Sequence, residues 1–214
     1  MLKKHKRTLI LTSLLILLPV LAGLLLWNTL PERIATHWGP DGQPDGWSGK
    51  SSTVFFLPFL ILAMHWFCIL ITSADKRNEK QTGKVFTMVA WICPIVSNFA
   101  GFAVFGTALG MDFDMNRLIF LLTGIIFMVI GNYLPKCKYN YTIGIKLPWT
   151  LNSEKNWNAT HRFSGKVMVI GSIILILCAF IPSIESVWVI LAILGVLVLI
   201  STLYSYFYSR KETE

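Results

Sequence analysis

The chain has 214 residues, of which 54% are hydrophobic and only 14% are charged. So apolar a composition excludes an ordinary soluble globular protein and indicates a membrane protein. The formal net charge of +8 is compatible with nucleic-acid binding, but in a membrane protein with several spans cations collect in the cytoplasmic loops.

Uncharged apolar runs near the length of a bilayer crossing, about 20 residues of helix, define the expected spans. The fifth run is short, and we expect it to gain a turn from Phe163 to Lys166. The predicted fold class is all-α, a polytopic membrane protein with six transmembrane helices. The six runs are residues 8–29, 53–73, 85–109, 118–134, 167–181 and 186–207.

The distribution of lysine and arginine predicts the orientation. Placing both termini in the cytoplasm (N-in/C-in) puts sixteen of the nineteen cations inside, so insertion accounts for the positive charge and no direct nucleic-acid partner is expected. The first run follows a basic head but is too long for a signal-peptide core, so it is read as an uncleaved anchor. The inside cations are Lys3, Lys4, Lys6, Arg7, Lys76, Arg77, Lys80, Lys84, Lys136, Lys138, Lys146, Lys155, Arg162, Lys166, Arg210 and Lys211.

The connection Leu30–Lys50, "LPERIATHWGPDGQPDGWSGK", lies on the outer side and is punctuated by Gly-Pro and Asp-Gly pairs that favour reverse turns. We expect a compact loop, and whether its tryptophans anchor it at the interface or contact a ligand stays open. Its histidine and aspartates match no known metal-site spacing, so no metal site is expected. The candidate peptide-binding residues are His37, Trp38, Asp41, Asp45 and Trp47.

Within the apolar runs the notable ionisable side chain is His65, and Asp, Glu, Lys and Arg are absent. Ion-coupled transporters usually keep charged groups inside the membrane, so this pattern argues against a secondary transporter. His65 is expected to bond a neighbouring helix. Small and polar residues, which permit close helix packing, define expected contact faces of the third and fourth spans. They are Pro94, Ser97, Asn98, Gly101 and Phe105 in the third, and Gly124, Gly131 and Asn132 in the fourth.

The inner connection Pro135–Lys166 is the longest, and loops of this length are functional or disordered. Leu147 precedes a proline and is expected to be extended, after which Asn152 or Ser153 can cap a helix. In that helix Trp157 and His161 share a face. We therefore expect an interfacial helix that leads into the fifth span. The four cysteines lack paired spacing, so no disulfide and no zinc site is expected.

The segment "GNYLPKCKYNYTIGIKLPWTLNSEKNWNATHRFSGKV" resembles the signature of the SdpI family of bacterial membrane proteins, and the outer loop resembles the DUF1648 segment often found before it. Lys146 and Leu147 stand where the family usually has Arg-Thr, which puts a two-pronged guanidinium contact in doubt. The resemblance divides the chain into a DUF1648-like segment, 1–75, and an SdpI-like domain, 76–214. It implies partner-binding importance for Asn132, Asn140, Gly144, Lys146, Pro148, Trp149, Thr150, Trp157, His161 and Arg162.

By this resemblance the chain is expected to be a non-enzymatic immunity protein of the bacterial cytoplasmic membrane, giving resistance to a secreted antimicrobial peptide and signalling by recruiting a cytoplasmic repressor. The alternative is a small-molecule transporter or a membrane-embedded enzyme, for which no paired carboxylates are found near His161. No cofactor is expected. The cationic inner face suits either anionic membrane lipid or an acidic protein partner, and both stay open.

Overall fold

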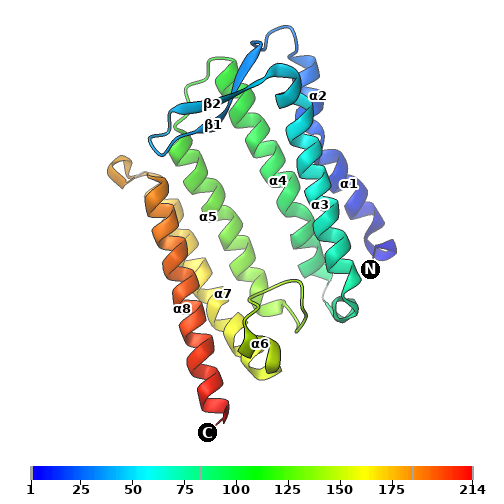
Figure 1. Cartoon of the computed structure of the whole chain (residues 1–214), viewed down its shortest axis with the longest axis vertical. Coiled ribbons are helices and arrows are strands. Elements are labelled where there is room, and N and C mark those ends of the chain that lie inside the picture. The colour runs from blue at the N-terminus through cyan, green and yellow to red at the C-terminus, as the bar shows by residue number, and fades with distance from the viewer. Residues whose placement is uncertain (1, 82, 185, 214) are drawn as a thin grey trace.

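The computed structural model describes residues 2–81, 83–184 and 186–213. Within these residues, six helices are long and apolar enough to cross a membrane, which confirms the predicted fold class. The first helix begins and the last helix ends at the same end of the bundle (Figure 1). The spanning segments are Lys3–Leu25, Ser52–Ala74, Gly83–Ala108, Met115–Lys136, Glu154–Cys178 and Val187–Glu212.

The first span is interrupted, because α1 (Lys6–Ile16) and α2 (Leu18–Leu25) are separate helices. Pro19 has no N–H to donate to the carbonyl of Leu15, so this oxygen lacks its usual helical bond and accepts only a backbone N–H at the end of α1. Asn98 of α4 (Gly83–Ala108) supplies the missing bond through Nδ2 at 2.8 Å. The polar residue of the third span therefore compensates for the proline of the first.

The remaining small and polar residues of α4 pack at the same place. Ser97 Oγ donates to the Ile16 carbonyl oxygen at 2.8 Å, and a Cβ on Gly101 would come within 2.9 Å of Pro19. In the second span, α3 (Leu57–Ala74), the buried His65 lies 3.3 Å from the Thr12 hydroxyl, as expected for a histidine that bonds a neighbouring helix. These contacts join the first three spans.

The fourth span, α5 (Met115–Tyr133), packs against α7 (Glu154–Cys178) through glycines. A Cβ on Gly131 would lie 2.9 Å from the Gly165 carbonyl oxygen, and one on Gly124 would lie 3.1 Å from the Ser172 oxygen. The expected contact face is confirmed for the two glycines but not for Asn132, which is exposed. One residue along a helix turns the side chain by about 100°, which takes Asn132 off this face.

The fifth span begins earlier than predicted. We expected an interfacial helix leading into a short apolar run, but α7 is one continuous helix that follows the short α6 (Pro148–Asn152). Its N-cap is the predicted Ser153, whose hydroxyl accepts from the Asn156 N–H at 3.1 Å. No proline or cap interrupts the chain between this cap and the apolar run, so the helix continues. Leu147 is extended, as predicted.

Helix α4 packs against α1, α2 and α3 on one side and against α5 on the other, while α7 also packs against α8 (Val187–Thr213). Figure 1 shows α5, α7 and α8 together on one side of the bundle. A division of the chain between residues 75 and 76 would separate α3 from α4, which are in contact. The domain boundary stays a prediction.

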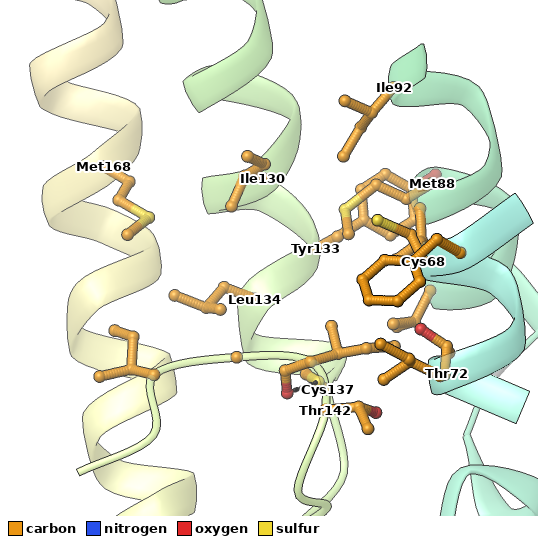
Figure 2. A pocket seen from close by; sticks show the side chains of 17 residues that line it. Cys68, Thr72, Met88, Ile92, Ile130, Tyr133, Leu134, Cys137, Thr142 and Met168 are labelled. Atoms are coloured by element: carbon orange, nitrogen blue, oxygen red, sulfur yellow. Dashed lines mark hydrogen bonds between the residues drawn. The ribbon is translucent and has the colours of Figure 1, made fainter. Parts of the chain in front are cut away.

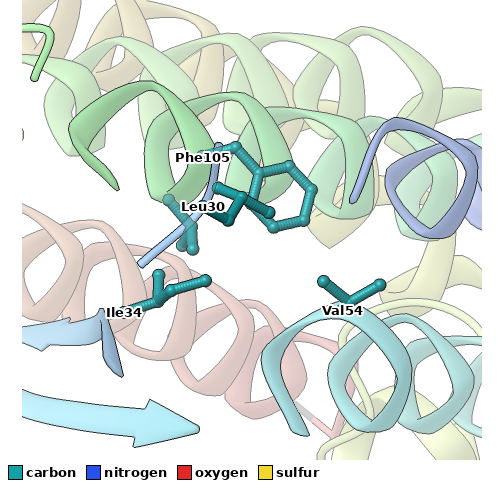
Figure 3. Close-up of a cluster of buried hydrophobic side chains, with 5 residues drawn as sticks. Leu30, Ile34, Val54 and Phe105 are labelled. Atoms are coloured by element: carbon teal, nitrogen blue, oxygen red, sulfur yellow. The ribbon is translucent and has the colours of Figure 1, made fainter. Parts of the chain in front are cut away.

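The outer loop contains strands that the sequence did not predict. β1 (Arg33–Trp38) and β2 (Pro44–Gly49) form a two-stranded antiparallel sheet, drawn at the end of the bundle away from the termini in Figure 1. The reversal includes Gly42 at φ +76°, a conformation that favours glycine. Ile34 of β1 is buried in a cluster with Leu30, Val54, Val104 and Phe105, shown in Figure 3, and this cluster fixes the hairpin to α4.

Candidate functional site

The inner connection folds over the first turns of α7 and encloses two aromatic side chains. Trp157 and His161 are buried and stacked, with ring centroids 4.0 Å apart. Trp157 Nε1–H donates to the Cys137 carbonyl oxygen at 2.9 Å. The i, i+4 pairing predicted from the sequence is confirmed, but these side chains face the inside of the loop, not a partner.

Both ring nitrogens of His161 are engaged. Nδ1 lies 2.8 Å from the Trp157 carbonyl oxygen, which can only accept, so Nδ1 carries the proton. Nε2 lies 3.1 Å from the Ile145 backbone nitrogen, which donates to it, so this nitrogen uses its lone pair. The imidazole is therefore held neutral and fully bonded, which suits a positioning role and leaves no free nitrogen for acid–base chemistry.

Gly144 makes this arrangement sterically feasible. Its φ is +120°, and a Cβ at this position would lie 2.3 Å from His161 Nε2 and 3.0 Å from the Trp157 ring. The backbone must pass directly over the stacked pair for Ile145 to reach the histidine. Only glycine combines this backbone conformation with this close approach.

Asn140 holds the preceding turn with both ends of its amide. Nδ2 donates to the carbonyl oxygens of Lys138 at 2.8 Å and Ile143 at 2.9 Å. Oδ1 accepts from the N–H groups of Thr142 at 2.8 Å and Ile143 at 2.6 Å. A fully bonded buried amide of this kind fixes one loop conformation.

The Pro-Trp-Thr segment continues the same ordered course. The buried Thr150 hydroxyl accepts from the Leu147 N–H at 2.8 Å, which closes the turn that starts α6. Trp149 packs edge-on against Tyr206 of α8, with ring centroids 5.5 Å apart. Its buried Nε1 has no hydrogen-bond partner among the described residues. The segment thereby joins the loop to the last span.

A second connection, between α3 and α4, is hydrogen-bonded to this loop, although no motif in the sequence points to it. Gln81 Nε2 donates to the Lys138 carbonyl oxygen at 2.6 Å, while its Oε1 accepts from the Lys138 N–H at 2.9 Å. Asn78 Nδ2 donates to Thr142 Oγ1 at 2.6 Å. Asp75 Oδ2 accepts from the Tyr141 N–H at 2.8 Å. We call this set of contacts, made by Asp75, Asn78 and Gln81 with residues 138–142, the inner clasp.

The inner clasp also carries a cation over aromatic rings. The Arg77 guanidinium lies 3.9 Å from the Tyr141 ring centroid and 5.2 Å from that of Tyr139. Cation–π contacts of this kind contribute most where water is excluded. The inner surface is thus assembled from two connections far apart in sequence. No local pattern could have shown this, because the bonded residues are separated by two spanning helices.

Apart from the half-buried Trp149, the predicted partner-binding residues fall into two groups. Asn140, Thr150, Trp157 and His161 are buried and shape the loop, and Gly144 lies against the stacked pair. Lys146 donates through Nζ to the Thr142 carbonyl oxygen at 3.3 Å, a single contact that a lysine can make without the planar guanidinium of arginine. The exposed members, which a partner could touch directly, are Asn132, Lys146, Pro148 and Arg162.

The buried Cys137 lies at the centre of the loop, outside the spanning segments. Burial raises the pKa of its thiol to about 11, although bonds from Asn140 and Gln81 act in the other direction. The thiol is therefore protonated at neutral pH and is a poor nucleophile. This fits a structural role for the cysteine.

The outer candidate residues lie on the hairpin. His37 Nδ1 contacts Asp45 Oδ1, Asp41 Oδ1 accepts from the Gln43 N–H at 3.1 Å, and Trp47 is 51% exposed. Trp38 packs partly against the buried cluster beneath the hairpin, so it anchors the sheet. Across the described part of the chain, no three His, Cys, Asp or Glu side chains gather as a metal site would require.

Comparison with known proteins matches both parts of the chain. Residues 136–205, which include most of the inner loop, match the SdpI/YfhL protein family, and residues 14–62 match a domain of unknown function, DUF1648. The immunity protein SdpI of Bacillus subtilis (strain 168) is 26% identical over 202 residues, which cover 94% of this chain and 96% of the relative. No solved structure matches. The chain is therefore a multi-pass membrane protein in which a segment that matches the DUF1648 model precedes a segment that matches the SdpI/YfhL family model.

Proposed function

We propose that this protein is an immunity protein of the bacterial cytoplasmic membrane that protects its cell from a secreted antimicrobial peptide. The similarity to the Bacillus immunity protein over nearly the full length of both chains carries this proposal. The match leaves out only 12 of the 214 residues, fewer than any spanning segment has, so every spanning segment and both ordered connections contribute to it. Similarity confined to one helix pair would not support a shared function.

The internal bonding of the inner loop favours a binding protein over an enzyme. His161, the side chain best suited to acid–base chemistry, is buried and uses both nitrogens within the loop. An enzyme that uses acid–base or nucleophilic catalysis needs its base or nucleophile at a site that the substrate can reach. The ordered hairpin, with its exposed Trp47, is the part of the outer surface that we propose meets the peptide. Recruitment of a cytoplasmic repressor stays a prediction of the family resemblance.

The test is survival of a sensitive bacterial strain that expresses this protein, challenged with a panel of hydrophobic antimicrobial peptides. We expect the wild-type protein to raise the inhibitory concentration of at least one peptide at least severalfold. Trp47→Ala should reduce that protection because it removes the exposed aromatic side chain of the hairpin. The matched control is Trp188→Ala. Trp188 is 67% exposed and lies in the first turn of α8, away from the hairpin in the sequence.

Membrane levels of each variant are measured by immunoblot, so that loss of protein is not read as loss of protection. Equal protection by Trp47→Ala and the wild type would contradict recognition by the hairpin tryptophan. Survival that does not depend on the protein, for every peptide in the panel, would contradict the immunity proposal itself.

A further inference from the structure

A cavity of about 400 Å³ lies between the two sides of the bundle, next to the inner loop. Its walls come from α3 and α4 on one side and from α5 and α7 on the other, and residues 142–145 form its floor. Figure 2 shows Cys68 and Met88 on one side and Ile130, Leu134 and Met168 on the other. Its volume falls within the range of small-molecule and cofactor sites.

The cavity opens toward the hydrocarbon of the bilayer. Its lining is almost wholly apolar, and none of the described residues that line it carries a charge. Phe67 and Ile71, which border it on α3, are 64% and 45% exposed. In a spanning segment, exposed apolar side chains contact lipid tails, so a bilayer molecule can enter without crossing water.

The inner rim of the cavity is cationic. Lys136 Nζ lies 4.5 Å from the ring centroid of Tyr133, and Lys146 Nζ bonds the Thr142 carbonyl oxygen; Tyr133 and Thr142 both line the cavity. The two inner connections, residues 75–84 and 136–148, together carry seven lysine and arginine residues against two carboxylates. An apolar cavity with a cationic rim at the membrane surface matches a molecule with a hydrocarbon chain and an anionic head.

We propose that this cavity binds one anionic phospholipid, with an acyl chain between the helices and the phosphate between Lys136 and Lys146. A zwitterionic lipid would offer the same chain, but its amine would meet the cationic rim with the wrong sign. The acyl chain of the lipid would contact residues 142–145, and Asn78, Asn140 and His161 hold this segment in place. The bound lipid therefore completes the packing beneath the inner loop. This inference does not depend on the proposed function.

The groove between α7 and α8 provides a structural control. It has a similar volume, about 420 Å³, and is also lined by apolar residues, among them Ile174. A tryptophan at Ile130 would fill part of the proposed lipid cavity, whereas a tryptophan at Ile174 would fill the control groove. The two substitutions change volume equally on neighbouring helices, so a difference between them reports which space holds the lipid.

The experiment uses the full-length protein, purified in mild detergent and mixed with equal amounts of phosphatidylglycerol and phosphatidylethanolamine that have the same acyl chains. Native mass spectrometry then counts retained lipids. We expect the wild type to retain phosphatidylglycerol preferentially. Lys136→Gln/Lys146→Gln should lower that preference roughly 30-fold, since each of the two cations contributes about 1 kcal/mol near an anionic lipid. Lys155→Gln removes an exposed cation in the first turn of α7 that is neither of the two rim lysines, and it should leave the preference unchanged.

Ile130→Trp should lose the retained lipid, and Ile174→Trp should keep it. The lysine substitutions lie at the surface, so they keep the test decisive if Ile130→Trp does not fold. Equal retention of both phospholipids by the wild type, or an unchanged preference in the double lysine variant, would overturn the proposal. Retention that survives in folded Ile130→Trp while peptide protection is lost would assign the cavity to the peptide and equally overturn it.

Discussion

His161 and Asn140 show how single side chains determine the inner loop. Each side chain donates a hydrogen bond from one atom and accepts one at another atom. A substitution that keeps the size of the side chain but changes one of these atoms therefore leaves a buried polar group unpaired. A buried unpaired polar group costs about 1–3 kcal/mol, more than a typical bond contributes. These residues therefore matter through the conformation that they impose on the chain.

Gly144→Ala adds a single methyl group, but it should destabilise the protein strongly. The new methyl group would lie 2.3 Å from His161 Nε2, at a backbone φ of +120°. Backbone strain of this kind costs roughly 1–3 kcal/mol, and displacement of the histidine would add the lost bond to Ile145. The measurement is the thermal unfolding midpoint of the purified protein in detergent.

The matched control for this substitution is Gly110→Ala. Gly110 also has a positive φ, +85°, but a Cβ there meets nothing within 4 Å. The Gly110→Ala variant therefore has backbone strain but no steric clash, and its thermal unfolding midpoint should fall less than that of Gly144→Ala. An equal fall for both variants would show that the contact with His161 contributes nothing.

At the scale of helices and connections, the apolar runs predicted the spans because crossing a bilayer depends on local composition, which a single sequence contains. The sequence does not predict the early start of α7, because residues 154–166 are polar and suggest an interfacial helix, although one face of this stretch, which includes Asn156 and Thr160, is buried. Asn156 Nδ2, for example, donates to the Ser205 carbonyl oxygen at 2.9 Å. The sequence does not predict the hairpin, because β2 contains Gly, Pro and Asp and neither strand shows clear apolar alternation.

The motif residues from Asn140 to His161 lie together in the inner loop, and their role in binding a partner stays a prediction. Ser153 caps α7, as local rules suggest. The inner clasp could not be predicted, because Gln81 and Lys138 are 57 positions apart and Asn78 and Thr142 are 64 apart. Contacts at that separation depend on how the spans pack, which local pattern does not determine.

Breaking the inner clasp should open the loop without unfolding the spans. Gln81→Ala removes two hydrogen bonds to the Lys138 backbone, each worth roughly 0.5–1.5 kcal/mol. The open population should therefore rise on the order of tenfold. The rate of trypsin cleavage after Lys138 and Lys146 in the solubilised protein measures this opening.

The control for this experiment is Gln43→Ala, which changes the other glutamine of the chain, an exposed residue between the two outer strands. Its cleavage pattern at the inner loop should match that of the wild type. If Gln81→Ala is cleaved no faster than Gln43→Ala, the clasp does not hold the inner loop closed.

At the scale of the whole molecule, the two ends of the bundle differ in charge and in structure. The first helix begins and the last ends beside the inner connections, and the hairpin covers the opposite end (Figure 1). The end with the termini holds sixteen of the nineteen lysine and arginine residues, which predicts that it faces the cytoplasm. The lipid, peptide and partner proposals all assign a side of the membrane on this basis.

Labelling of single added cysteines by a membrane-impermeant maleimide tests the orientation in intact cells. Gln43→Cys at the hairpin tip should react, because its side chain is exposed and is predicted to lie outside, whereas Lys155→Cys should react only after the cells are permeabilised. Exposed positions are needed, since a cysteine at the buried Asn156 would escape labelling on either side of the membrane. The unmodified protein supplies the background: Cys137 and Cys178 are buried, and Cys68 and Cys93 lie within spans that the reagent does not enter. Labelling of Lys155→Cys but not Gln43→Cys in intact cells would reverse the orientation and place the hairpin in the cytoplasm, where it could not meet a secreted peptide.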